Sequence, residues 1–230
     1  DGVHDTDGIS MHIKGEMGKI QFGGNSAGDS YSIDAIVAGD DYFGTGDVEY
    51  AGGEEIGVSN EQNGIGWHME IGDISAGIGF VDAGTASSND TMSYGAKAKL
   101  GFATIQGAYE TDDNDQTLSI GAEAKIAGNK ITIAQNSNKD DAATYDYTGK
   151  SIGIERNLTD SLEIAAHYAT ADDGKDTGFE FNQKAVTLTK TIASGFKAHA
   201  TWTDYEEKQT GGAANDETGT SYNFGLTVSF

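Results

Sequence analysis

The chain has 230 residues, enough for one sizeable domain, and it contains no proline and no cysteine. The absence of cysteine argues against a disulfide scaffold and against thiolate metal sites. Lysine and arginine total 14 against 37 acids, and the formal net charge of −23 argues against binding to nucleic acid, whose phosphates would be repelled. No run of roughly 18–20 apolar residues is present, so the sequence predicts no membrane-spanning helix.

Apolar and polar residues alternate with a period of two through most of the chain, which predicts half-buried β-strands. In residues 220–230, for example, Tyr222, Phe224 and Leu226 share one face while Asn223 and Gly225 share the other. Applied in chain order, this pattern predicts about thirteen strands. They span residues 8–14, 18–23, 63–71, 74–83, 91–100, 103–112, 117–127, 129–137, 150–157, 161–171, 183–192, 195–205 and 220–230.

The predicted connectors alternate between short and long, which indicates an up-and-down meander with one tight rim and one elaborated rim. One connector is far longer than the rest: residues 24–62 lie between two neighbouring strands. Such long connections are uncommon unless they are functional or disordered. Because this segment carries both apolar residues that can pack and many acids, we expect it to fold into the lumen of a barrel.

These features together resemble the trimeric general-diffusion porins of Gram-negative outer membranes. The resemblance is carried by the final alternating strand ending in Phe230, the run Gly18-Lys19-Ile20 before the very long connector, the short–long alternation and the acidic, glycine-rich composition. It implies an all-β fold, a transmembrane antiparallel up-and-down β-barrel with an inward-folded constriction loop at residues 24–62. It also implies a bacterial outer-membrane location, with Phe230 as the C-terminal assembly signal.

The resemblance also implies a homotrimer in contact with outer-membrane lipid and lipopolysaccharide. Family barrels have sixteen strands, with both chain ends on the side of the tight turns. Here the chain starts on the side of the long loops. We therefore expect the N-terminal strands, about three, to be absent from this chain.

A diffusion pore needs a narrow waist and charges on facing walls. The acids of the long loop are the candidates for the negative side: Asp34, Asp40, Asp41, Asp47 and Glu49. By alternation, the candidates for pore-lining basic residues are His12, Lys14, Lys19, Lys97 and Lys99, and Lys125, Lys197 and His68 share this inward face. For any one of these charges the alternative is a solvated side chain without a role.

One departure from the family pattern is the scarcity of arginine, because Arg156 is the sole arginine of the chain. The usual arginine row either lies on the absent strands or is missing because the pore prefers cations. Acidic runs in other loops, such as residues 112–115, are either solvated or bind Ca²⁺. No other cofactor is expected.

The sequence predicts no enzyme. Its five histidines form no metal-binding helix motif, and no nucleophile elbow is present. The predicted function is therefore a water-filled channel for small hydrophilic solutes and ions. Three alternatives remain: a solute-selective channel with the same architecture, an acidic β-sandwich adhesin, and a hydrolase active at the barrel rim.

Overall fold

The computed structural model describes residues 11–22, 64–81, 90–112, 114–140, 146–173, 180–208 and 216–229. Thirteen strands lie within these ranges, as the alternation predicted. They are β1 (Met11–Gly15), β2 (Gly18–Phe22), β3 (Gly64–Ile71), β4 (Ile74–Val81), β5 (Thr91–Leu100), β6 (Ala103–Thr111), β7 (Asp115–Ile126), β8 (Asn129–Asp140), β9 (Asp146–Thr159), β10 (Leu162–Asp173), β11 (Glu180–Ala193), β12 (Phe196–Lys208) and β13 (Glu217–Val228). The described residues form no helix that is long and apolar enough to cross a membrane.

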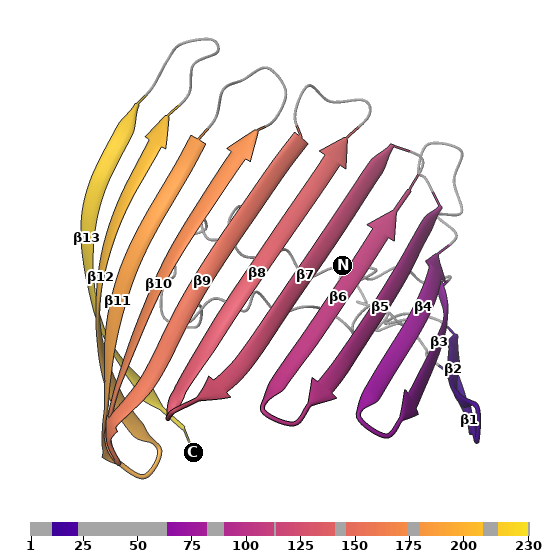
Figure 1. The fold of residues 1–230 in the computed structure, drawn as a ribbon, viewed down its shortest axis with the longest axis horizontal. Helices are drawn as coiled ribbons and strands as arrows, with labels where there is room; N and C mark the ends of the chain where they lie inside the picture. Colours follow the sequence, from indigo (N-terminus) through magenta and orange to yellow (C-terminus); the bar gives the residue numbers. More distant parts are fainter. Residues whose placement is uncertain are drawn as a thin grey trace, which may run out of the picture.

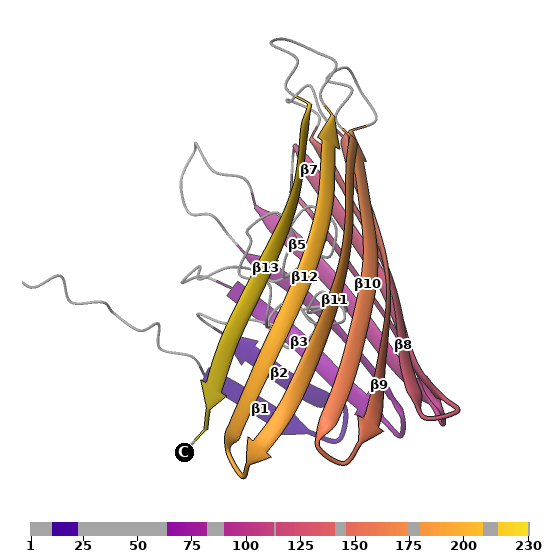
Figure 2. The same cartoon turned by 90° about the vertical axis from the view of Figure 1, so that its left-hand side faces the viewer.

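All thirteen strands belong to one sheet, and each strand pairs antiparallel with the next one in the chain. The sheet is not flat: it curls into a trough-shaped wall, with β13 and β1 at its two margins (Figures 1 and 2). The up-and-down fold class is therefore confirmed. A single continuous sheet does not fit the β-sandwich alternative, which requires two.

The two margins of the wall do not pair with each other among the described strands. β1 and β13 both run towards the rim of the tight turns, so they are parallel to one another (Figure 2). Antiparallel closure of the wall therefore needs an odd number of strands between them. This parity agrees with the expectation of about three further strands, which stays a prediction.

Tight two-residue turns at one rim join every second pair of strands, and glycines with positive φ lie at most of these turns. Gly195, between β11 and β12, has φ 73°, a conformation that L residues rarely adopt. At the β7–β8 turn both central residues have positive φ, Ala127 at 50° and Gly128 at 79°. Two such residues are typical of the hairpin turn whose twist matches that of the strands.

The two faces of the sheet differ in chemistry and in exposure. Small and hydroxyl side chains lie on the concave face and are buried; Thr132 and Thr187 are each 1% exposed. Aliphatic side chains lie on the convex face, where Ile133 and Ile152 are each 51% exposed. A water-soluble sheet buries its aliphatic face instead. This wall is therefore inverted: its outside is apolar and its inside is polar.

The strands extend beyond the apolar band at the long-loop rim, and here the predicted boundaries were wrong. β9 was predicted to begin at residue 150 and β11 at 183, whereas they begin at Asp146 and Glu180; β12 ends at Lys208 instead of 205. The outward residues of β8 change from Ile131 and Ile133 to polar side chains towards this rim. Because both faces are polar there, alternation disappears although the hydrogen-bonded ladder continues.

Candidate pore wall

The concave face is built from polar side chains, some of which form hydrogen bonds across neighbouring strands. Ser119 Oγ on β7 donates to Asn136 Oδ1 on β8 at 3.0 Å. The hydroxyls of Thr187 on β11 and Thr201 on β12 are 3.0 Å apart. Such pairs keep the polar atoms hydrogen-bonded although the residues are buried. The concave face can therefore line a water-filled space without filling it.

The predicted basic residues with described side chains lie on this concave face. Lys14 on β1 pairs in register with Lys19 on β2, and Lys19 pairs with His68 on β3. Lys97 and Lys99 on β5 pair with Gln106 and Thr104 on β6. The further inward residues Lys125 and Lys197 also lie on this face, at the registers Lys125↔Lys130 and Lys197↔Thr191.

The structure adds an ion-pair cluster that the sequence analysis missed. Lys130 Nζ on β8 lies 2.8 Å from Glu155 Oε1 on β9 and 3.9 Å from Glu123 Oε2 on β7. All three side chains are only 20–35% exposed. Lys130 lies on the inward face of β8, and the register of three strands brings the two glutamates beside it. With one lysine for two glutamates, the cluster leaves one carboxylate uncompensated on the inner wall.

Several predicted site residues lie outside the described residues. They are the loop acids Asp34, Asp40, Asp41, Asp47 and Glu49, and the terminal Phe230. His12 has a described backbone on β1, opposite Gln21, but no described side chain. The constriction loop and the assembly signal therefore stay predictions.

The concave face has one apolar cluster, which the sequence analysis also missed. Ala169 and Ala171 on β10 and Phe181 on β11 are at most 3% exposed, and Tyr205 on β12 packs against them. The Tyr205 hydroxyl donates to Glu217 Oε1 on β13 at 2.8 Å. The cluster lies in the half of the wall nearer the long loops.

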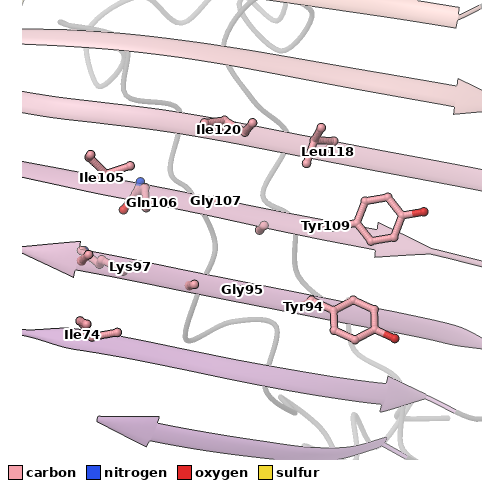
Figure 3. Close-up of a pocket in the computed structure, with 13 residues that line it drawn as sticks. Ile74, Tyr94, Gly95, Lys97, Ile105, Gln106, Gly107, Tyr109, Leu118 and Ile120 are labelled. Atoms are coloured by element: carbon pink, nitrogen blue, oxygen red, sulfur yellow. The ribbon is translucent and has the colours of Figure 1, made fainter. Parts of the chain in front are cut away.

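The convex face shows how an apolar surface is arranged on a barrel wall. Tyr94 on β5 and Tyr109 on β6 lie side by side, with ring centroids 6.3 Å apart (Figure 3). Beside them along the strands is a shallow hollow, lined by Gly107, Ile105, Ile120 and other residues (Figure 3). Aromatic side chains at the edge of an aliphatic band are typical of membrane barrels.

Comparison with known proteins finds similar folds but no similar sequences. No family model and no curated protein matches the sequence. Solved structures do match: the outer-membrane-expressed OmpT of Vibrio cholerae has a TM-score of 0.66 at 12% identity, covering 95% of this chain and 79% of that chain. An anion-selective porin from Comamonas acidovorans has a TM-score of 0.62 at 13% identity, covering 95% and 75% respectively.

The outer-membrane channel DcaP of Acinetobacter baumannii has a TM-score of 0.63 at 8% identity, covering 90% of this chain and 71% of that chain. This chain has the Gram-negative porin fold. Thus the resemblance drawn from weak motifs is confirmed at the level of the fold, at identities where sequence comparison alone is uninformative.

Within this porin fold, the described side chains show no group of three or more histidines and acids that could hold a metal ion. One acidic run, residues 112–115, is partly described: Asp112 Oδ1 accepts from the backbone N–H of Asn114 at 2.7 Å and of Asp115 at 2.6 Å. This carboxylate therefore caps its own turn. Ca²⁺ binding by this and the other acidic loops stays a prediction.

Proposed function

We propose that this chain is an outer-membrane porin that forms a water-filled channel for passive diffusion of small hydrophilic solutes and ions. The inverted wall is the observation that carries this function. A polar concave face tolerates water, and an exposed aliphatic convex face requires lipid. The porin fold supports the location in the bacterial outer membrane.

Selectivity is proposed to come from two facing sets of charges. Lys14, Lys19, Lys97 and Lys99 supply the basic side on the described wall. The acids of residues 24–62 supply the other side. Lys14 and Lys19 face each other directly across β1 and β2, which is unfavourable for like charges unless anions or acidic groups lie nearby. An acidic constriction loop is such a group.

A homotrimer is part of the same proposal, as is contact with lipopolysaccharide. One of the matching structures is of a trimer form, that of in-vitro folded OmpT of Vibrio cholerae, which is 13% identical. The chain is proposed to have no enzymatic activity, because a diffusion channel requires none. An ester or peptide hydrolysis activity that survived purification would contradict this part of the proposal.

The decisive experiment is single-channel recording in planar bilayers with reversal potentials under a salt gradient. The detergent-purified full-length protein is expected to conduct. A variant with Asp40, Asp41, Asp47 and Glu49 replaced by their amides is expected to conduct with a reversal potential shifted towards anion preference. An unchanged reversal potential would refute the role of the loop acids, and absence of conductance would refute the pore.

A solute-selective channel is the second candidate, and the partly buried Tyr205, which packs against the buried cluster of Phe181, is the observation that favours it. An aromatic side chain on an otherwise polar wall can guide the ring face of a sugar. Replacing Tyr205 with Ser distinguishes the two functions. Conductance block by a panel of oligosaccharides would weaken in a selective channel and stay absent in a general one.

A further inference from the structure

Inward-facing lysines of the described wall gather at one of its two rims. Each of them lies two or four residues from the nearest tight turn: Lys14, Lys19, Lys97, Lys99, Lys125, Lys130 and Lys197. The strands continue for up to eleven further residues towards the long loops. Within the described ranges, no lysine or arginine faces inward along that remaining length.

Acidic side chains lie at the opposite rim of the same face, near the long loops. Glu110 is the penultimate residue of β6 and Asp115 begins β7, both on the concave side. Glu207 on β12 and Glu217 on β13 pair directly across the strands, and both face inward there. Like charges placed opposite each other are unfavourable, so this rim attracts cations.

The lysine rim keeps a positive excess after its own acids are counted. Four glutamates face inward in this half: Glu70, Glu123, Glu155 and Glu163. Lys130 lies 2.8 Å from Glu155 and 3.9 Å from Glu123, so it neutralises one of these two carboxylates, and Glu70 lies 3.6 Å from the ring of His68. Glu16, Asp73 and Asp160 lie in the turns at the end of the wall, where they are exposed to bulk solvent and strongly screened.

From this arrangement we infer that the lumen is polarised along its axis and that the pore rectifies ionic current. The inference rests on the proposed channel function and specifies how that channel conducts. The acidic half holds cations and the basic half holds anions. A positive potential on the long-loop side drives both ions from their own zones towards the middle of the pore, where they accumulate and raise the conductance. The opposite potential depletes the middle of ions and lowers the conductance.

Salt concentration sets the size of the effect, because fixed charges act over a Debye length. That length is about 10 Å at 0.1 M salt and about 3 Å at 1 M. The current at positive long-loop potential is therefore expected to exceed the reverse current by about 1.5-fold or more at 0.1 M, and the ratio is expected to approach one at 1 M.

The test uses the full-length protein in planar bilayers, with its orientation established independently. The chain contains no cysteine, so Ser194→Cys in the exposed β11–β12 turn gives a single thiol at the tight-turn rim. A membrane-impermeant thiol reagent added to one chamber then identifies the side on which that rim lies.

Two matched variants each lose four positive charges. The inward variant replaces Lys97, Lys99, Lys125 and Lys197 with Gln. The outward control makes the same Lys-to-Gln change at four positions on the convex face: Lys139, Lys150, Lys184 and Lys190. The current ratio is expected to fall towards one in the inward variant and to keep its wild-type value in the control. If the inward variant does not insert into the bilayer, the double variant Lys97→Gln with Lys99→Gln is used instead. It is expected to lower the current ratio by a smaller amount.

The inference would be overturned by a wild-type current ratio of one, or below one, at 0.1 M salt. It would also be overturned if the inward variants had the same current ratio as the wild type. An equal loss in both variants would also overturn it, because total charge would then be responsible. Absence of any conductance in the wild type would instead contradict the channel itself, so the two failures are distinguishable.

Discussion

Ile133 and Ala134 are neighbours on β8 that face opposite sides of the wall, and lysine at each position tests the inverted wall directly. Ile133 lies on the convex face and is 51% exposed. In a membrane its side chain contacts hydrocarbon, and a lysine there costs about 2–4 kcal/mol near the bilayer centre. If the convex face contacted water, Ile133→Lys would cost at most about 1 kcal/mol. This is half the free energy of burying an isoleucine side chain completely, because Ile133 is half exposed.

Ala134 lies on the concave face between Gly121 on β7 and Ser151 on β9, which are small residues. A lysine at this position can extend into a wet lumen, so Ala134→Lys is expected to cost less than about 1 kcal/mol, as surface substitutions do. If this face were a dry core, the same substitution would bury a charge and cost several kcal/mol. The order of the two variants therefore reverses between the two environments.

The assay is reversible denaturant unfolding of each variant in phospholipid vesicles, with the free energy of unfolding obtained by linear extrapolation. The expected result is a loss of about 2 kcal/mol or more for Ile133→Lys relative to Ala134→Lys. If Ala134→Lys proved the more damaging substitution, the assignment of the two faces would be refuted.

Three further substitutions test the ion-pair cluster and the turns. Lys130→Met leaves Glu155 without its partner; it is expected to shift the reversal potential towards cation preference and to cost less than about 1 kcal/mol, because the pair is partly exposed. An unchanged reversal potential would show that this cluster lies outside the conducting path. Gly195→Ala is expected to destabilise the β11–β12 hairpin by about 1–2 kcal/mol, since φ is positive and a Cβ would overlap the Ser229 carbonyl oxygen. The matched change Ala127→Gly removes a strained side chain at positive φ and is expected to stabilise in the same unfolding assay; a loss of stability there would contradict the turn geometry.

Strand number, strand order and the face of each residue could be predicted from the sequence, because a period of two is a local property. The inward positions of Lys97 and Lys99, for example, follow directly from the aliphatic residues beside them. Strand ends near the long loops could not be predicted, because both faces are polar there and the signal disappears.

Side-chain contacts between strands also could not be predicted from the sequence. Lys130 contacts Glu155 only because β8 and β9 pair in one register, and alternation is compatible with every register that shifts by two residues. The cluster of Phe181 and Tyr205 depends on register in the same way.

The extension of the strands beyond the apolar band has a consequence for amide hydrogen exchange. Protection from exchange depends on access of water to the hydrogen-bonded backbone as well as on the ladder itself. In β8 the backbone near Ile131 lies within the band, whereas the backbone near Lys139 belongs to the same ladder but lies past it. The boundary between slow and fast amides is therefore expected to fall inside the strands, at the lipid edge, and to trace the bilayer surface around the wall.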